Sequence, residues 1–486
     1  MSSVRLDFDS CYRALESRDA RFDGQFIVGV RTTRIYCRPS CPTPTRPHRR
    51  NVSFYRTAAA AQLTGLRACK RCRPDAVAGS PEWDTRGDLV GRAMRLLGDA
   101  VVDREGIPGL AQRLAISERH LNRLLVEEVG APPLAIARTQ RAQTARVLIE
   151  TTDLPFRGIA FAAGFGSVRQ FNDTIREVFA GTPSELRHAR RNGEQRTPGH
   201  VTLRLPVRVP FDGAGIVAWL GARAVSGVEA VDEGVYRRVL GLPGGVGVVS
   251  LAPADNHVVA TFGLTAIADL ATAVYRCRRL LDLDADPEAV AGALVSDAAL
   301  GAIVAASPGR RVPGSVDGAE SAIRAVLGQQ ISVAGARTIA GRLAVAFGVP
   351  LDEPDGNLSH PFPSAEALAD ANLTGFGLTG ARQRTLRELA RRLASGSIVL
   401  DSGADRDDAR RQLLDVPGIG PWTASYVALR ALGDPDEFPA EDLGLLRAAA
   451  RLGLSTSPKE LAARAERWRP WRSYATHHLW AVETTK

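Results

Sequence analysis

Four cysteines lie in two close pairs near the start of the chain, with the spacings Cys37-x3-Cys41 and Cys69-x2-Cys72. Two thiol pairs separated by a loop can supply the four sulfur ligands of a tetrahedral Zn²⁺ ion. Residues 31–73 contain eleven Lys or Arg and no Asp or Glu. Because a zinc ion with four thiolates is formally a dianion, this basic surround suggests that a further anion approaches, and a DNA phosphate is the obvious candidate. On spacing alone, a structural zinc site is favoured over a reactive one.

A second segment could also take part in binding or catalysis. It is Val416-Pro417-Gly418-Ile419-Gly420-Pro421-Trp422, which fits the turn of a helix-hairpin-helix. Gly418 and Gly420 would let backbone N–H groups approach a phosphate without reading any base. Asp442 follows twenty residues after Trp422. Taken alone, this hairpin also suits ligases, polymerases and pure binding modules, and Asp442 alone would be assigned as a helix N-cap.

The composition limits the class of protein that carries these segments. A chain of 486 residues is expected to hold about three domains. Six cysteines, four of them in the candidate ligand set, make a disulfide scaffold improbable. The first twenty residues do not have the pattern of a signal peptide, and no apolar run is long enough to span a membrane. We therefore expect a reduced, cytoplasmic protein.

Charge divides the chain into two parts. Residues 1–200 carry 32 basic and 21 acidic side chains, whereas the remaining residues carry 30 and 32. The excess of positive charge at the front is the electrostatic signature of a nucleic-acid binder. The rear part would have to bind DNA through local geometry rather than through a net field.

Residues 88–190 have the pattern of helices with two helix-turn-helix units. In the first, a short helix over 107–115 is followed by Ser117, a good N-cap for a helix over 118–129. In the second, Gly164 fits a turn that needs a left-handed residue, and a helix begins after Ser167. Residues 190–199 are expected to form a linker.

The pattern changes after residue 200. Residues 201–207, 246–249 and 257–264 are predicted to be strands, and helical patterns dominate from about Pro287.

Residues 8–75 closely resemble the N-terminal domain of the Ada methylation-response regulators, through the runs 30–41, 51–55 and 69–75. The resemblance implies that Cys37 is a nucleophile as well as a ligand, and that it takes a methyl group from a methylphosphotriester. It implies one Zn²⁺ held by a four-cysteine site, with DNA contacts nearby. The residues concerned are Cys37, Cys41, Cys69 and Cys72 for zinc, and Arg34 and Arg71 for DNA.

Methylation would also change the charge of this site. Cys37 would become a thioether, and the cluster would lose one negative charge, which weakens its repulsion of the DNA backbone. The alternative is that the zinc is structural and Cys37 is never alkylated.

The middle segment resembles the AraC-type regulators, notably in Gly164-Phe165, Phe171, Phe179 and Gly181-x-Pro183. In such domains the second helix of each unit lies in the major groove. The resemblance therefore implies that exposed polar residues of these helices bind DNA. The principal candidates are Arg119, Arg123, Arg169 and Gln170. For any single residue, a solvated helix-face charge is an equally good interpretation.

Residues 200–484 resemble the AlkA family of 3-methyladenine DNA glycosylases, in Gly328-Gln329-Gln330-Ile331-Ser332, the hairpin, Glu441-Asp442 and 467–475. The resemblance implies that Asp442 stabilises the developing sugar cation once the nucleotide has been extruded. It further implies an aromatic pocket of Trp422, Tyr426 and Trp480 for a cationic base. Gln330 stands where the family places a wedge, often a leucine, so its polar side chain departs from the pattern. For Trp468 and Trp471 we expect core packing.

One absence predicts the type of cleavage. Glycosylases that also nick the backbone use a lysine in the hairpin to form a Schiff base. This chain has Trp422 at that position, and its three lysines, Lys70, Lys459 and Lys486, lie elsewhere in the sequence. Hydrolysis without strand cleavage is expected.

We therefore predict a multidomain α+β protein. Its expected parts are a small zinc α/β domain (1–80), an all-α double helix-turn-helix domain (85–190), a mixed α/β subdomain (200–312) and an all-α helix-hairpin-helix glycosylase domain (313–486). The predicted function joins a methyl-sensing transcriptional activator to a glycosylase that excises 3-methyladenine and 7-methylguanine. Double-stranded DNA and RNA polymerase are the expected partners of a monomer. The alternative is a regulator whose glycosylase half is inactive and only clamps DNA.

Overall fold

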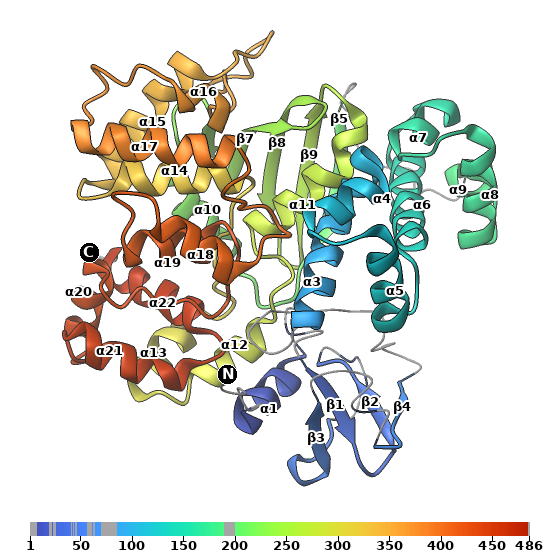
Figure 1. Cartoon of the computed structure of the whole chain (residues 1–486), viewed down its shortest axis with the longest axis horizontal. Coiled ribbons are helices and arrows are strands. Elements are labelled where there is room, and N and C mark those ends of the chain that lie inside the picture. Colours follow the sequence, from blue (N-terminus) through green and yellow to red (C-terminus); the bar gives the residue numbers. More distant parts are fainter. Residues whose placement is uncertain are drawn as a thin grey trace.

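The computed structural model describes residues 7–18, 22, 26–39, 41, 43, 46–55, 61, 64–69, 85–188 and 200–484. The expected linker at 190–199 lies outside the described residues. Figure 1 shows a small sheet with helix α1 at the N-terminal end, a group of helices, a central sheet, and a second, larger group of helices. This arrangement confirms the predicted multidomain α+β fold.

In its described residues, the N-terminal part, here called the cysteine domain, is a four-stranded sheet beside helix α1. The strand order is β3-β1-β2-β4, with β1 antiparallel to β2 and β3, and β2 parallel to β4. Asp7 caps the helix by accepting a hydrogen bond from the Ser10 backbone N–H at 2.8 Å. The elements are α1 (Phe8–Ser17), β1 (Ile27–Val30), β2 (Ile35–Cys37), the 3₁₀ turn η2 (Arg49–Asn51), β3 (Val52–Tyr55) and β4 (Arg67–Ala68).

The helix-turn-helix region contains the second group of elements. The predicted N-cap Ser117 and the predicted helix start after Ser167 are confirmed. Each serine hydroxyl accepts a hydrogen bond from the third residue of the helix that follows it. Gly164 has a φ of 82°, the left-handed conformation expected at that turn. The helices are α3 (Thr85–Gly98), α4 (Val101–Arg113), α5 (Glu118–Val129), α6 (Pro133–Thr151), α7 (Phe156–Ala162), α8 (Val168–Phe179) and α9 (Pro183–His188).

The first predicted helix differs from the observed one at both ends. Helix α4 starts at Val101 and ends at Arg113, whereas 107–115 was expected. Gly106 breaks it with non-helical backbone angles, so Pro108 lies in the first turn of the segment that follows, where its missing N–H costs nothing. Ala115 has a φ of 55°, which is incompatible with a right-handed helix.

The central sheet has the order β5-β9-β8-β7-β6, and all neighbouring strands are antiparallel. Three of its strands were predicted; β6 and β7 were not. The elements of this subdomain are β5 (His200–Pro206), α10 (Gly213–Gly221), β6 (Glu229–Asp232), β7 (Val235–Leu242), β8 (Gly245–Pro253), β9 (His257–Leu264), the 3₁₀ turn η4 (Ile267–Asp269) and α11 (Leu270–Leu280).

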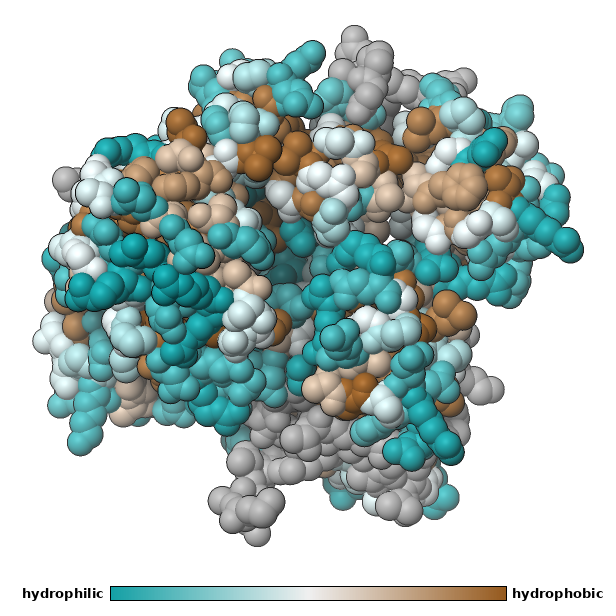
Figure 2. All heavy atoms as spheres, turned by 45° about the horizontal axis from the view of Figure 1, so that its top comes forward, coloured by the Kyte–Doolittle hydropathy of each residue, from teal (hydrophilic) through white to brown (hydrophobic). Residues whose placement is uncertain are grey.

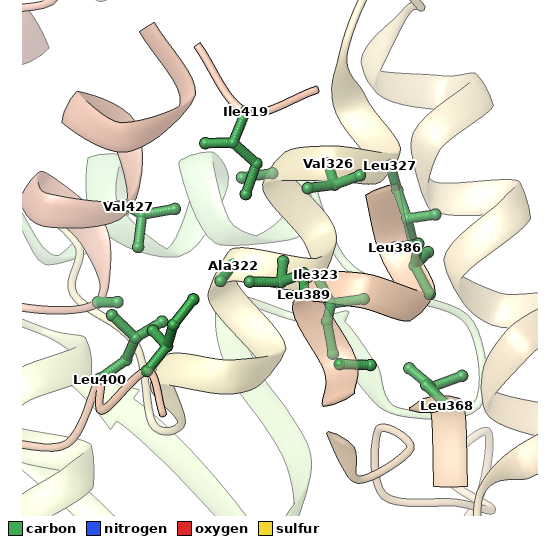
Figure 3. Packing of buried hydrophobic residues seen from close by; sticks show 14 of the residues in the cluster. Ala322, Ile323, Val326, Leu327, Leu368, Leu386, Leu389, Leu400, Ile419 and Val427 are labelled. Carbon is green, nitrogen blue, oxygen red and sulfur yellow. The ribbon is translucent and has the colours of Figure 1, made fainter. Parts of the chain in front are cut away.

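The C-terminal helices pack around α14, whose Ile323, Val326 and Leu327 are fully buried. Figure 3 shows these side chains close to Leu386 and Leu389 of the neighbouring helix α17. The elements are α12 (Pro287–Leu294), α13 (Ala298–Ala306), α14 (Gly318–Gly328), α15 (Val333–Phe347), α16 (Ala365–Ala369), α17 (Gly380–Ala394), α18 (Arg406–Leu414), α19 (Pro421–Arg430), α20 (Leu443–Arg451), α21 (Pro458–Ala465), η5 (Glu466–Trp468) and α22 (Arg472–Thr484).

A buried ion cluster joins the central sheet to α14. The Arg238 guanidinium, 3% exposed, lies 3.3 Å from Glu229 and 2.7 Å from Glu320. Arg324 contacts the same two carboxylates at 2.9 and 2.8 Å. Two arginines thus balance two glutamates, as a buried cluster requires.

Replacing Glu320 with alanine is expected to destabilise this junction strongly. The substitution leaves Arg238 buried with one remaining partner, a situation that costs about 3–5 kcal/mol. Scanning calorimetry of Glu320→Ala should show a clearly lower Tm than wild type. Asp370→Ala is the control, because the Asp370 side chain is 88% exposed and its ion pair with Arg391 contributes little. Equal Tm values for Glu320→Ala and wild type would refute the assigned role of the cluster.

The helix-turn-helix region is packed against the C-terminal helices through α3. Arg92 Nε donates to the Gly403 carbonyl at 2.6 Å, and Arg95 Nε donates to the Ser402 carbonyl. Gly403 has no side chain to obstruct the contact: a Cβ there would lie 2.4 Å from Leu96. Helices α3 and α4 accordingly lie beside the central part of the molecule in Figure 1.

No helix in the described ranges is long and apolar enough to cross a membrane. On the face shown in Figure 2, hydrophobic residues form small areas separated by hydrophilic ones.

Candidate active site

A cavity of about 480 Å³ lies between the C-terminal helices and the central sheet, and the four residues predicted for the base pocket and its acid line it together. Trp422 and Tyr426 project from α19, one turn apart. Trp480 projects from α22, and Asp442 immediately precedes α20. The positions are far apart in sequence, but the hairpin and the two helices bring them to one wall.

Three N–H groups hold the Asp442 carboxylate. Trp422 Nε1 donates to Oδ2 at 2.7 Å, and Trp480 Nε1 donates to Oδ1 at 2.8 Å. The Leu445 backbone N–H also donates to Oδ1, at 2.9 Å. Asp442 is therefore an N-cap and a cavity residue at once, and the two assignments do not compete. These three donors fix the orientation of the carboxyl group at the start of α20.

The aromatic rings form a continuous wall beside this carboxylate. The Trp422 and Tyr426 rings are stacked, with centroids 5.5 Å apart and an interplanar angle of 17°. Tyr426 and Trp480 are tilted, with centroids 6.1 Å apart. Electron-rich faces of this kind attract a cationic ring system. Trp468 and Trp471, by contrast, are 1% and 0% exposed, so their predicted core role is confirmed.

Sequence reasoning missed a further residue of the cavity lining. Trp219 of α10 lines the cavity, and the guanidinium carbons of Arg223 and Arg430 lie 4.0 and 4.3 Å from its ring centroid. Burial lowers the pKa of both arginines, that of Arg430 to about 10, so Arg430 stays charged at neutral pH. Trp219 precedes the hairpin by about two hundred residues, and no local pattern marks it as a cavity residue.

His477 lies behind the two tryptophans. Its ring centroid is 5.3 Å from that of Trp219 and 5.9 Å from that of Trp480. Burial lowers the pKa of this imidazole well below its ordinary value, and nearby arginines lower it further, so the ring is neutral at pH 7. An uncharged ring therefore packs against both Trp219 and Trp480.

The hairpin turn connects α18 to α19 and shows why its two glycines differ. Gly418 has a φ of 92°, and a Cβ there would lie 2.1 Å from Thr385 Oγ1, so only glycine fits. Gly420 has ordinary backbone angles, and a Cβ there would meet nothing within 4 Å. The space beside Gly420 is thus open to an incoming group such as a phosphate.

The predicted wedge, Gln330, is exposed in the turn between α14 and α15 and has a φ of 56°. Its neighbour Gln329 holds this turn against the hairpin: Gln329 Nε2 donates to the Gly418 carbonyl and to Thr423 Oγ1, both at 3.0 Å. The turn that carries Gln330 is therefore joined to the hairpin by the hydrogen bonds of Gln329.

Three of the four predicted zinc ligands converge in the cysteine domain. The sulfurs of Cys37, Cys41 and Cys69 lie within 4.8 Å of one another, and all three residues are buried. The Cys41 and Cys69 sulfurs are 3.9 Å apart. A tetrahedral zinc with bonds of about 2.3 Å requires sulfur spacings of about 3.8 Å, so the donor set fits the ion. Cys72, the fourth predicted ligand, lies outside the described residues.

Local structure fixes these thiols. Cys37 ends strand β2, and the backbone N–H of Cys69 donates to the Tyr36 carbonyl at 2.9 Å, which places it beside the end of that strand. Arg34, a predicted DNA contact, is exposed in the turn before β2, with a φ of 52°. Arg71 lies outside the part of the chain that the structure describes.

The predicted DNA-reading side chains of the helix-turn-helix units are all exposed. Arg119 and Arg123 lie on α5, and Arg169 and Gln170 begin α8. The Arg169 side chain is 93% exposed, whereas Gln170 Oε1 accepts a hydrogen bond from the Gly166 N–H at 3.2 Å. These side chains remain accessible although the region is packed against the rest of the chain.

Comparison with protein families shows matches to four domain models, spread along the chain. They are the metal-binding domain of Ada (residues 10–75), a helix-turn-helix domain (110–189), the AlkA N-terminal domain (202–317) and the HhH-GPD superfamily of base excision DNA repair proteins (323–473).

Similar proteins cover the chain in whole or in part. A probable bifunctional transcriptional activator/DNA repair enzyme AlkA of Mycobacterium tuberculosis is 57% identical over 98% of this chain and 96% of its own length. DNA-3-methyladenine glycosylase 2 of Escherichia coli is 36% identical over 56% of this chain and 95% of its own. The solved structure of a 3-methyladenine DNA glycosylase from Archaeoglobus fulgidus, 23% identical, covers 58% of this chain and 98% of that one with a TM-score of 0.52, and so shares the fold.

Proposed function

The chain belongs to the AlkA family of bifunctional transcriptional activators and DNA repair enzymes, and from this membership we propose that its C-terminal half excises alkylated purines from DNA. One observation carries the proposal: the carboxyl group of Asp442 is held by two tryptophan N–H groups in an aromatic cavity next to a hairpin turn. The substrates would be 3-methyladenine and 7-methylguanine in duplex DNA.

The cavity residues would have separate roles in cleavage. An alkylated purine carries positive charge, so its N-glycosidic bond is already weak and the base leaves with the bonding electron pair. The wall of Trp422, Tyr426 and Trp480 would hold the extruded cationic base. Asp442 would stabilise the positive charge that develops on the sugar and orient the water that attacks C1′. The products are the free base and an intact strand with an abasic site.

The direct test is base release from methylated duplex DNA. Wild type should liberate free 3-methyladenine, detectable by chromatography, without breaking the strand. Absence of free base under conditions where the chain binds the duplex would refute the proposed activity and favour a protein that only clamps DNA.

Gln330 is proposed to fill the gap left by the extruded nucleotide. Gln330→Ala should slow base release from a fully paired duplex about tenfold, because the vacated stack is no longer supported. The effect should be smaller when the lesion faces a mismatch, since extrusion then costs less. Single-turnover rates on the two duplexes measure this difference. A uniform loss on both duplexes, or none, would contradict the wedge role.

The cysteine domain is proposed to sense methylphosphotriesters through Cys37. A bound zinc ion, held by Cys37, Cys41, Cys69 and Cys72, would keep the sulfur of Cys37 in its nucleophilic thiolate form. The Cys37 sulfur would bond to the methyl carbon while the carbon–oxygen bond breaks, and the electron pair would remain on the phosphate oxygen. The transfer is stoichiometric, and it removes one negative charge from the cluster, which favours DNA binding.

The helix-turn-helix region is proposed to carry this signal to promoters. Arg119, Arg123, Arg169 and Gln170 are exposed on the two helices that would enter successive major grooves. We propose that the methylated chain binds as a monomer and activates transcription through a contact with RNA polymerase.

A further inference from the structure

Helix α17 presents a row of arginines beside the hairpin turn. Its buried residues, including Leu386 and Leu389, face α14 (Figure 3). Arg384, Arg387 and Arg391 are spaced by three and four residues, so they share the opposite face of the helix. A groove of about 580 Å³ runs between this face and the hairpin, and its lining includes these three arginines together with Pro417 and Gly418.

Two of these arginines have no acidic partner among the residues that the structure describes. In the described part of the chain, no carboxylate lies within ion-pair distance of Arg384 or Arg387. Glu388, which also lines the groove, is paired with Arg392 at 2.8 Å, so its charge is already balanced. Arg391 is paired with Asp370. The groove therefore carries an uncompensated charge of two at its hairpin end.

The hairpin is fixed directly onto this helix. Thr385, next to Arg384, donates through Oγ1 to the Pro417 carbonyl at 2.8 Å. Gly418 allows the close approach, because any Cβ there would collide with the same hydroxyl. Arg382 donates to the Gln329 carbonyl and so ties the Gln330 turn to the same helix. The hairpin, the proposed wedge and the arginine row therefore form one rigid surface.

We propose that Arg384 and Arg387 bind a backbone phosphate of duplex DNA in this groove, adjacent to the phosphate that the hairpin turn contacts. The inference rests on the proposed function, since it assumes that the hairpin meets DNA. Guanidinium groups match phosphate oxygens geometrically and in charge, and such contacts position a duplex without reading its sequence. The site would add affinity and register to the glycosylase half, whose overall charge is slightly negative.

Salt-dependent DNA binding by the full chain tests this site. The probe is a fluorescent duplex with one stable abasic-site analogue, measured by anisotropy in excess unlabelled, unmodified duplex that occupies the helix-turn-helix region. Arg384→Ala/Arg387→Ala should raise the half-saturating concentration about tenfold and reduce the slope of log affinity against log salt by about 1, the value for one lost phosphate contact. The Arg384→Lys/Arg387→Lys chain should retain most of the wild-type slope, because it keeps both charges.

Arg467→Ala provides the matched control, since Arg467 is an exposed arginine on η5 that lines neither cavity. It should leave the slope unchanged. Equal slopes for wild type and the double alanine chain would overturn the proposed site. Base release is measured separately, with the wild-type chain on methylated duplex. If wild type releases no base but the double alanine substitution still reduces the slope, the glycosylase proposal is refuted and the phosphate site stands.

Discussion

A Cys37→Ala chain is expected to accept no methyl group from DNA that carries methylphosphotriesters, whereas wild type should gain about 14 Da on the peptide that contains Cys37. The reason is positional: the Cys37 sulfur belongs to the cluster with Cys41 and Cys69, where a metal would keep it ionised. Mass spectrometry of the digested protein measures the gain and locates it.

Two other cysteines provide internal controls for this experiment. Burial raises the pKa of the Cys11 thiol far above its ordinary value and that of Cys277 to about 12, so both are neutral thiols at pH 7. Neither should be methylated in wild type or in the variant. Methyl groups on Cys41 or Cys69, or an unmodified Cys37 peptide from wild type, would show that the zinc is structural or that another thiol is the acceptor.

The second large effect is expected at Asp442. Asp442→Asn should slow the release of 3-methyladenine about 10³-fold or more, because the substitution removes the negative charge that faces the developing sugar cation. The rate at saturating enzyme, measured by chromatography of the free base, reports this step separately from DNA binding.

The asparagine side chain should leave the protein folded. Its oxygen can still accept the Leu445 N–H, and asparagine is as good an N-cap as aspartate. Glu441→Gln is the matched control, since it removes one charge from the exposed neighbouring residue. A similar loss in both variants would point to net charge near the cavity rather than to Asp442. Equal release by wild type and Asp442→Asn would assign cleavage to another group.

Local patterns predicted the helices well where capping residues define their ends. Ser117 and Ser167 placed the starts of α5 and α8 correctly, because an N-cap acts on its own next turn. The start of α4 was missed, since the segment before Gly106 carries no comparable signal and is helical through its packing in the interior.

The resemblance to a family, rather than periodicity, predicted that four residues share one site. They are Trp422, Tyr426, Asp442 and Trp480. The rest of the cavity could not be predicted in this way. Trp219 reaches the cavity only because the central sheet carries α10 to the hairpin side. Likewise, Glu229, Arg238 and Glu320 look like surface charges in sequence, and their burial follows from tertiary packing alone.

The most direct test of the account is the product analysis of one reaction, in which the wild-type chain is incubated with methylated duplex DNA. We predict that free 3-methyladenine appears in solution while the strand stays intact and becomes cleavable only after alkali treatment. A strand that is nicked without alkali, or a duplex that is bound but keeps all of its methylated bases, would contradict the assignment of Asp442 and its aromatic cavity to hydrolytic base excision.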